Sequence, residues 1–524
     1  MIAVRRLLLI VSFISIVSAG SAFGSATNIY ITANGSPSGN CTTNVQTPAF
    51  VTTAGNWGSG SGQIGSGTTV LFCGTFTLPV GGSLASFLGS GTSSNAITFK
   101  LDSNAVIQSQ AMGSASSGAF NCSGKSYVTV DGGSNGIIQN TANGTGLTKS
   151  QASQGLYFVN CINIVVKNLN IQNIYQNAGS NSHATDTHGV NTSDVYFDNG
   201  NSTGAQIFNN TLNDARTGIA MNFDDGGDAS NVLIYGNTIS DHGWSIQFGA
   251  DNSSSTASGV VIHDNNISGW TNWQFPDDTY HTDGLILYND SGRSAAYDTY
   301  TIYNNQFSGT LGNGSPTGYI ACGVMSTCTI FNNLMVDNGS YPSWGYIWLY
   351  TPNGTDAVYN NTLIASSNGG VGVTLGDDAG LGGGTASHLT VKNNIFTNVT
   401  YGLHDYRSLT TDITASDENV WRTPSGSAPA FETNDSTQIS FATWQNDGFD
   451  VSSTTSDPKL GSNYVPQSGS SAIGLGANLT GLDISSLDFD MADSPRPGSG
   501  SWVAGTYDAA GGPAPPQGLV AVVH

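Results

Sequence analysis

A short pattern of apolar and polar positions recurs through the middle of the chain. An apolar residue is followed by one variable residue, two positions rich in asparagine, a second variable residue and another apolar residue. The copies cover residues 207–212, 234–239, 262–267, 302–307, 330–335, 358–363 and 391–396. Aligned on their second asparagine position, they are spaced by 27, 28, 40, 28, 28 and 33 residues. Repeats of this length are typical of solenoids and propellers.

The length of the repeat favours a solenoid. Each unit reads as one strand ending at the asparagine motif, a glycine-containing turn and a second short strand, such as 219–223. A propeller blade needs four strands in about 40 residues, whereas a parallel β-helix needs only two or three short strands per coil. Asparagines at successive bends can also stack their side-chain amides. We therefore predict an all-β parallel β-helix. Its inward column is Leu212, Ile239, Ile267, Phe307, Met335, Leu363 and Phe396.

Composition supports this fold class and excludes an all-α fold. The chain has 68 Gly, only 9% charged residues, and Glu418 and Glu432 as its only glutamates. Helical proteins need many more charged and strongly helix-forming residues on their surfaces. We divide the chain into a signal peptide (1–22), an N-terminal cap with the first coils (28–120), the β-helix body (121–407), C-terminal closing coils or a cap (408–512), and a tail or linker stub (513–524).

The N-terminus predicts export. Arg5 and Arg6 precede an apolar run from Leu7 to Val17, and small residues suited to cleavage follow it. The run is too short to cross a bilayer of about 30 Å. We expect a secreted or periplasmic protein after cleavage. The formal net charge of −22 argues against nucleic acid and anionic membranes as partners, and we expect a monomer.

Six cysteines make an even number, which an exported protein can use for disulfides. Their order along the chain suggests the pairs Cys41 with Cys73, Cys122 with Cys161, and Cys322 with Cys328. Free buried thiols are the alternative. The spacing shows no metal-binding pattern such as two cysteines separated by two residues.

These features together resemble the secreted right-handed parallel β-helix proteins of the pectate lyase superfamily. The resemblance rests on the asparagine repeat, on the opening segments 29–35 and 67–76, and on the closing segments 457–460, 469–476, 496–497 and 505–508. It implies a right-handed helix. It says little about chemistry, because this fold carries lyases, hydrolases, epimerases and inert adhesins.

One edge of the predicted solenoid gathers histidine and aspartate. The turns that follow the asparagine motif supply His183, Asp186, His188, Asp214, Arg216, Asp241, His242, Asp277, Asp278, His281 and Asp283. Coils stack at the strand spacing of about 4.8 Å, so these residues would form a ladder about 15 Å long. Aspartate is common in turns for conformational reasons alone, but turn geometry does not call for histidine.

Aromatic residues occur on the same side of the repeat. The candidates for binding a sugar polymer are Trp244, Trp270, Trp273, Tyr280 and Trp344. Aromatic rings stack on the apolar faces of sugars, although rings in such turns also pack under long loops. Together with the acidic edge, they favour a neutral or weakly acidic polysaccharide as the partner.

Hydrolysis is the first chemistry that this edge can support. It requires a protonated carboxyl and a second carboxylate. His281-Thr-Asp-Gly284 is similar to the Asn-Thr-Asp-Gly motif of polygalacturonases, which implies a catalytic Asp283. Asp277-Asp278 and His242-Gly243 resemble their paired-aspartate and His-Gly motifs, with Asp241 adjacent. The order of the motifs departs from that family, and no Arg-x-Lys motif follows.

Three further hypotheses remain open. In β-elimination, His242 or His281 would be the base and Arg216 would neutralise a uronate, with Ca²⁺ as a candidate cofactor. Hydrolysis requires no cofactor. A Zn²⁺ site would use His183, Asp186 and His188, with His242 joining them. The third hypothesis is a protein without catalytic activity that binds glycans or acts as a surface adhesin. Enzymatic hydrolysis is the leading interpretation.

Overall fold

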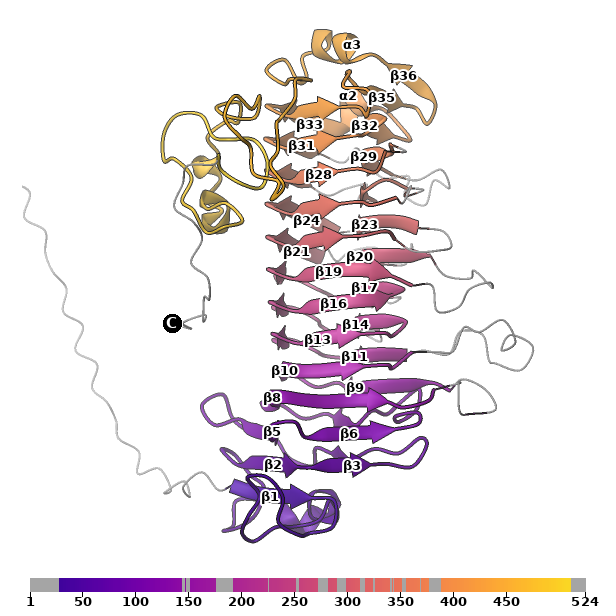
Figure 1. The fold of residues 1–524 in the computed structure, drawn as a ribbon, viewed down its shortest axis with the longest axis vertical. Coiled ribbons are helices and arrows are strands. Elements are labelled where there is room, and N and C mark those ends of the chain that lie inside the picture. Colours follow the sequence, from indigo (N-terminus) through magenta and orange to yellow (C-terminus); the bar gives the residue numbers. More distant parts are fainter. Residues whose placement is uncertain are drawn as a thin grey trace, which may run out of the picture.

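The computed structural model describes residues 28–509, except 144–146, 148–150, 176–191, 225, 251–253, 272–280, 290–297, 312–315, 324–325, 340–341, 343, 351–354, 368 and 377–387. The chain is a right-handed parallel β-helix whose coils stack along one long axis (Figure 1). This confirms the predicted fold class.

Each coil contributes strands to three rows, and the first two rows belong to one 23-stranded sheet. The first row contains β1 (Asn28–Thr32), β2 (Thr69–Cys73), β5 (Ile97–Leu101), β12 (Gln206–Phe208), β15 (Leu233–Tyr235), β18 (Val260–His263), β21 (Asp298–Tyr303), β24 (Ser326–Phe331), β27 (Ala357–Tyr359), β30 (Leu389–Lys392) and β33 (Ile413–Asp417). The second row contains β3 (Thr75–Thr77), β6 (Val106–Ser109), β13 (Thr211–Asn213), β16 (Thr238–His242), β19 (Asn266–Trp270), β22 (Gln306–Ser308), β25 (Leu334–Val336), β28 (Thr362–Ile364), β31 (Ile395–Thr397) and β34 (Val420–Arg422). The long strands β8 (Val128–Asn140) and β10 (Val165–Gln172) run through both rows.

The third row is a separate 13-stranded sheet. It contains β4 (Ala85–Ser86), β7 (Phe120–Ser123), β9 (Ser153–Val159), β11 (Thr192–Asp198), β14 (Thr217–Asn222), β17 (Trp244–Ala250), β20 (Thr282–Asn289), β23 (Pro316–Cys322), β26 (Ile347–Leu349), β29 (Val371–Leu375), β32 (Tyr401–Asp405), β35 (Ala430–Thr433) and β36 (Thr437–Ile439). Short helices lie outside the rows: α1 (Ala49–Thr52), η1 (Ala54–Asn56), α2 (Leu409–Asp412), α3 (Phe441–Asn446), η2 (Thr480–Leu482) and η3 (Ser485–Asp488).

The asparagine motif lies between two strands rather than at the end of one. In the coil at β12, Asn209 has a left-handed backbone with φ 55°, and the chain bends there into β13. Asparagine tolerates this conformation better than most residues. The expected single strand is therefore two short strands, and the coil has three strands in all.

The second asparagine of each motif forms a continuous hydrogen-bonded ladder inside the solenoid. The side-chain amide of Asn210 donates to the Oδ1 of Asn237 at 2.9 Å, and the same contact repeats from coil to coil up to Asn419. Each amide also donates to a backbone carbonyl of the preceding coil, such as Asn237 to Ile207 at 2.9 Å. The predicted stacking of amides is confirmed, and it satisfies backbone groups that the bend would leave buried and unpaired.

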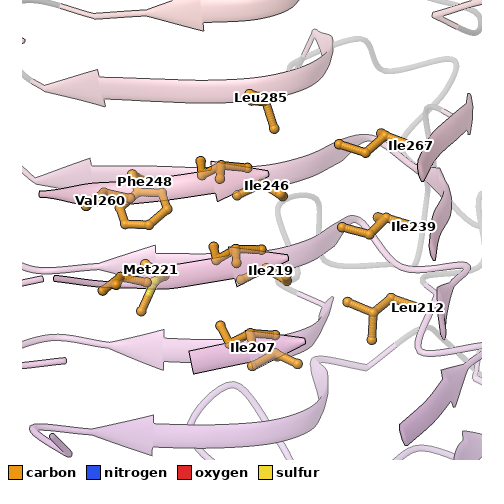
Figure 2. Close-up of a cluster of buried hydrophobic side chains, with 14 of the residues drawn as sticks. Ile207, Leu212, Ile219, Met221, Ile239, Ile246, Phe248, Val260, Ile267 and Leu285 are labelled. Carbon is orange, nitrogen blue, oxygen red and sulfur yellow. The ribbon is translucent and has the colours of Figure 1, made fainter. Parts of the chain in front are cut away.

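The hydrophobic core runs through the centre of the coils. All seven residues of the predicted apolar column are fully buried. Figure 2 shows Leu212, Ile239 and Ile267 one above another in successive coils, with third-row residues such as Ile219 and Ile246 facing them. Because each coil repeats the pattern of the one below it, identical side-chain positions stack and the core is continuous.

Three disulfides join the predicted cysteine pairs: Cys41 with Cys73, Cys122 with Cys161, and Cys322 with Cys328. Disulfides persist in oxidising compartments, so these bonds fit an extracellular protein. Among the described residues, no helix is long and apolar enough to cross a membrane.

Residues 456–509 form a closing segment that returns along the outside of the first row (Figure 1). Leu479, Leu487 and Trp502 pack against Phe331 and Tyr359 of that row. The buried guanidinium of Arg496 donates to the Oδ1 of Asn332 at 2.9 Å and to backbone carbonyls of the segment itself. The segment therefore covers the upper part of the solenoid wall.

Candidate active site

Two aspartates occupy equivalent turn positions on successive coils. Asp214 follows β13 and Asp241 lies near the end of β16, with φ of 62° and 60°. The next coil has Gly269 at this position, also at φ 62°. A Cβ on Gly269 would lie 2.9 Å from the Oδ1 of Asp241, so this glycine leaves room for the carboxylate. Turn conformation explains why these residue types occur here, and coil stacking brings the two carboxyls together.

The pKa of the Asp214 carboxyl is raised to about 6. Partial burial is the main cause, because it disfavours the charged form, and the neighbouring charge of Asp241 adds to it. Asp241 also accepts a hydrogen bond from the side-chain amide of Asn213 at 3.4 Å. The turn thus holds a carboxyl that retains a proton in mildly acidic solution beside a second carboxyl.

Beneath this turn, His242 and Asp194 form a pair inside the solenoid. The Nε2 of His242 lies 2.8 Å from the Oδ2 of Asp194, and both side chains are completely buried. Burial raises the pKa of Asp194 well above its usual value, with a contribution from Asp214, and lowers the pKa of His242 to about 3. These two pKa shifts favour a protonated Asp194 that donates a hydrogen bond to a neutral imidazole. A fully buried ring cannot contact a dissolved polymer, and this position argues against the expected role of His242 as a catalytic base.

A second group of predicted residues gathers where the third row begins. Thr217, Trp244 and Asp283 are in register on β14, β17 and β20. The guanidinium carbon of Arg216 lies 4.8 Å from the centroid of the Trp244 ring, which is a cation–π distance. The indole N–H of Trp244 donates to the backbone carbonyl of His281 at 2.7 Å.

Asp283 is fully buried and pairs with the Nδ1 of His281, whose side chain is about one-third exposed. Burial raises the pKa of Asp283, while His281 opposes that shift. The indole N–H of Trp270 donates to the backbone carbonyl of Asp283 at 2.9 Å, and Trp270 itself belongs to the core. His281 and Arg216 are the partly exposed members of this group, whereas Trp244, Trp270 and Asp283 are buried.

The remaining predicted residues are placed apart from these groups or not described. Trp344 packs edge-on against Trp348 of β26, with ring centroids 4.2 Å apart, farther along the third row. His183, Asp186, His188, Trp273, Asp277, Asp278 and Tyr280 lie outside the described residues. Among the described residues, no group of three or more metal-ligating side chains occurs.

The outer face of the third row carries polar and aromatic side chains that sequence reasoning did not single out. The carboxylate of Asp198 accepts from Tyr157 at 2.5 Å and from Tyr196 at 2.9 Å. Asn222 donates to the hydroxyl of Tyr196 at 2.9 Å, and Gln247 extends the network to Asn222. Asp198 and Asn222 are partly exposed.

The local sequence does not reveal that the tyrosines of this face point outward. Tyr157 stands between Leu156 and Phe158, and Tyr196 between Val195 and Phe197. A run of three apolar residues conceals the alternation that marks an outward side chain. The pairs Tyr157 with Tyr196 and Trp348 with Tyr350 form small clusters separate from the main core.

No family model and no curated protein matches this chain. Solved structures do resemble it, and two of them illustrate the likeness to this chain. The crystal structure of pectate lyase Pel9A has a TM-score of 0.39 and 14% identity, covering 93% of this chain and 97% of that one. The exopolygalacturonase from Thermotoga maritima has a TM-score of 0.33 and 11% identity, covering 70% of this chain and 81% of that one. Both are parallel β-helix proteins, and likeness at these identities concerns the fold.

Proposed function

We propose that this protein is an exported carbohydrate-active enzyme that hydrolyses a polysaccharide at the turn of Asp214 and Asp241. The observation that carries the proposal is the pairing of these two carboxyls on successive coils, with the pKa of Asp214 raised to about 6. Glycoside hydrolysis needs one protonated carboxyl and one carboxylate, and different environments commonly divide these roles.

In this mechanism Asp214 is the general acid and protonates the glycosidic oxygen. Asp241 then serves either as the nucleophile or as the base that activates water. Separations of about 5 Å between the carboxyls favour retention at the anomeric carbon, and roughly 6.5–9.5 Å favour inversion.

The outer face of the third row supports binding of a polymer. β14 begins directly after Arg216. A polysaccharide bound at the turn of Asp214 and Asp241 would therefore continue over this face. Asp198, Asn222 and Tyr288 offer hydrogen-bonding groups there, and Trp348 offers a partly exposed ring. With a net charge of −22, the protein favours neutral or weakly acidic glycans over strongly anionic ones.

The test compares wild type with Asp214→Asn and Asp241→Asn on a panel of neutral and uronate polysaccharides. New reducing ends without new ultraviolet absorbance indicate hydrolysis, and both variants should lose at least about 100-fold in rate. Asp447→Asn, an exposed aspartate far from the turn, is the matched control and should retain full activity. Full activity in Asp214→Asn would refute the assignment of the acid.

β-Elimination remains the competing chemistry, and Arg216 is the reason to keep it. Its guanidinium stands next to the acidic turn over Trp244 and could neutralise a uronate carboxylate, with bound Ca²⁺ assisting. An unsaturated product absorbs in the ultraviolet, so the same panel with and without Ca²⁺ separates the two reactions. Loss of that absorbance in Arg216→Gln would favour elimination.

A glycan-binding protein without catalytic activity is the second candidate function. The observation in its favour is the outer face of the third row, where Asp198 fixes two tyrosines by hydrogen bonds and so presents a rigid surface. Retained polysaccharide binding by wild type, with no product of either kind, would favour this function. Export is tested by N-terminal sequencing of the secreted protein, which should begin after residue 22.

A further inference from the structure

A cavity of about 290 Å³ lies between the solenoid and the closing segment. One wall comes from the second row, including Thr397 of β31 and Arg422 of β34. The other wall is Asp457, Leu460 and Tyr464. This volume is just below the range of about 300–1,000 Å³ for small-molecule sites, which limits a ligand to about one sugar unit.

Tyr464 adopts a backbone conformation that is unusual for its residue type. Its φ is 63°, in the left-handed region, where a bulky residue is an outlier. Hydrogen bonds from Tyr464 N to Gly461 O and from Gly461 N to Val465 O, both 2.9 Å, hold the turn. Strained residues of this kind cluster at binding sites. Tyr464 also lines the cavity.

Arg422 is a cation without an ion-pair partner among the described residues. Its Nη1 donates to the backbone carbonyls of Gly426 at 3.2 Å and Thr455 at 3.1 Å, which fixes the guanidinium plane. The chain has 13 basic and 35 acidic residues, so an arginine left without a carboxylate at a cavity is conspicuous. Its remaining N–H groups are donors for a ligand.

The other polar groups of the cavity complement this donor. Asn398 donates its side-chain amide to Ala365 O at 3.1 Å, which leaves its carbonyl oxygen as an acceptor. Asp457 has one carboxylate oxygen engaged by the backbone N–H of Lys459. An aromatic ring, a fixed guanidinium and two oxygen acceptors match a ring with apolar faces and hydroxyl groups around its edge.

The cavity lies along the same edge as the acidic turn but well away from it. In the second row, Ser240, Ser268, Ser308, Val336, Ile364 and Thr397 are in register from coil to coil. Asp241 follows Ser240 and Asn398 follows Thr397, so the two places are five coil steps apart, about 24 Å at the strand spacing. A polymer held at the turn and a sugar held in the cavity would occupy separate sites.

We propose that this cavity is a second saccharide site, which binds one sugar unit between Tyr464 and Arg422 and takes no part in bond cleavage. The choice of a sugar rests on the proposed function, whereas the existence of the site rests on the cavity and its side chains. Tyr464 would stack on the sugar ring, Arg422 would donate to its oxygens, and Asn398 and Asp457 would accept from its hydroxyls.

The test is calorimetric titration of the full chain with galactose, mannose, xylose and galacturonic acid, and with short oligosaccharides of each. Tyr464→Gly removes the ring and relieves the backbone strain, because glycine accepts a positive φ; it should weaken binding at least ten-fold with the fold intact. Arg422→Gln should do the same. Tyr127→Gly is the matched control, since Tyr127 is also left-handed at φ 56° but lines no part of the cavity.

The two proposals fail in different ways. Asp214→Asn should abolish cleavage and leave the binding that depends on Tyr464 unchanged. Binding of a saccharide that neither Tyr464→Gly nor Arg422→Gln weakens would overturn the second site even if the enzyme cleaves polysaccharide. Sugar binding that both variants lose, in a protein that cleaves nothing, would support the site and refute the proposed hydrolysis. Absence of binding to every saccharide would overturn the site.

Discussion

The imidazole of His242 and the carboxyl of Asp194 lie 2.8 Å apart in the interior of the solenoid, although 48 residues separate them in sequence. Gly218 lies beside this pair, where a side chain would clash with the neighbouring coil. A Cβ at that position would meet the backbone oxygen of Ser245 at 2.6 Å and the Cε1 of His242 at 3.4 Å. The Nδ1 of His242 and the Oδ1 of Asp194 have no hydrogen-bond partner among the described residues. The core therefore contains a polar pair whose contribution to stability depends on the protonation of Asp194 and His242.

This pair predicts how stability varies with pH. The pKa of His242 falls from 6.5 to about 3 on folding. Its contribution to the stability of the folded state therefore becomes less favourable as pH drops below about 6.5. The pKa of Asp194 rises well above 3.8, so its contribution worsens as pH rises above about 4. The two effects oppose each other between about pH 4 and pH 6.5, so a variant is needed to separate them. We expect the contribution of Asp194 to lower the melting temperature as pH rises above about 4.

The variant Asp194→Asn isolates this effect. An asparagine amide can donate to the Nε2 of His242 but does not titrate, so the melting temperature of this variant relative to wild type should increase as pH rises above about 4. Thermal unfolding followed by circular dichroism across pH measures it. Asp447→Asn removes one exposed charge and controls for the change in net charge. An unchanged slope in Asp194→Asn would contradict the predicted protonation of the pair.

Asp214 predicts a trade-off between activity and stability. Its carboxyl has a pKa raised to about 6 by burial and by Asp241, so the folded protein resists ionisation of this group. Asp214→Asn should raise the melting temperature above about pH 6 while it removes the acid required for cleavage. In wild type, the rate should fall as pH rises through about 6. A variant that is both inactive and less stable would indicate a purely structural role.

The asparagine ladder predicts a large loss of stability from a single amide. Asn333 donates to Ile302 O, Phe331 O and the Oδ1 of Asn361, and it accepts from Asn305. Asn333→Ala should lower the free energy of unfolding by about 2–4 kcal/mol, because each buried group left unpaired costs about 1–3 kcal/mol. Asn338→Ala, an exposed asparagine of the same coil, should change it by less than about 0.5 kcal/mol. Denaturant titration measures both.

Arg496 predicts separate release of the closing segment. Its guanidinium joins Asn332 of the solenoid to carbonyls of Gly505 and Thr506. Arg496→Leu should leave the buried carbonyls unpaired and expose Trp502. Limited proteolysis should then cut within 456–509 before the coils, with a shift in tryptophan fluorescence. Lys459→Ala, an exposed cation of the same segment, should be cut like wild type; equal resistance of Arg496→Leu would refute this role.

The solenoid could be predicted because its determinants are local and repeated. Asn210, Asn237 and Asn265 hold equivalent places in successive copies, so one alignment placed the bends, the inward column and the register together. The disulfides followed from chain order, since coil neighbours are close in space. The sequence does not show that the strand of each asparagine motif is divided in two. A left-handed asparagine such as Asn209 bends the backbone there without a glycine or proline to mark the bend.

The sequence indicates which edge of the solenoid carries the candidate residues, but it does not indicate the role of each residue. His242 and Asp241 are adjacent in sequence, yet one is buried and the other lies in the turn. Sequence shows neither this divergence nor the partner of His242, since Asp194 comes from a distant strand. Asp214 was placed in the ladder without a chemical role, because its raised pKa depends on burial and on a charge from the next coil.

The ladder of amides also has a direction. Within the ladder, each asparagine side chain donates to the Oδ1 of the asparagine in the following coil, and the last one, Asn419, donates to the Oδ1 of Asp450 at 3.0 Å. The indole groups of Trp421 and Trp444 donate to the same carboxylate. Aligned dipoles polarise one another, so this row has a positive end, and the buried carboxyl of Asp450 lies there. The side-chain N–H groups of Asn419, Trp421 and Trp444 therefore converge on one carboxyl, which closes the ladder at its C-terminal end.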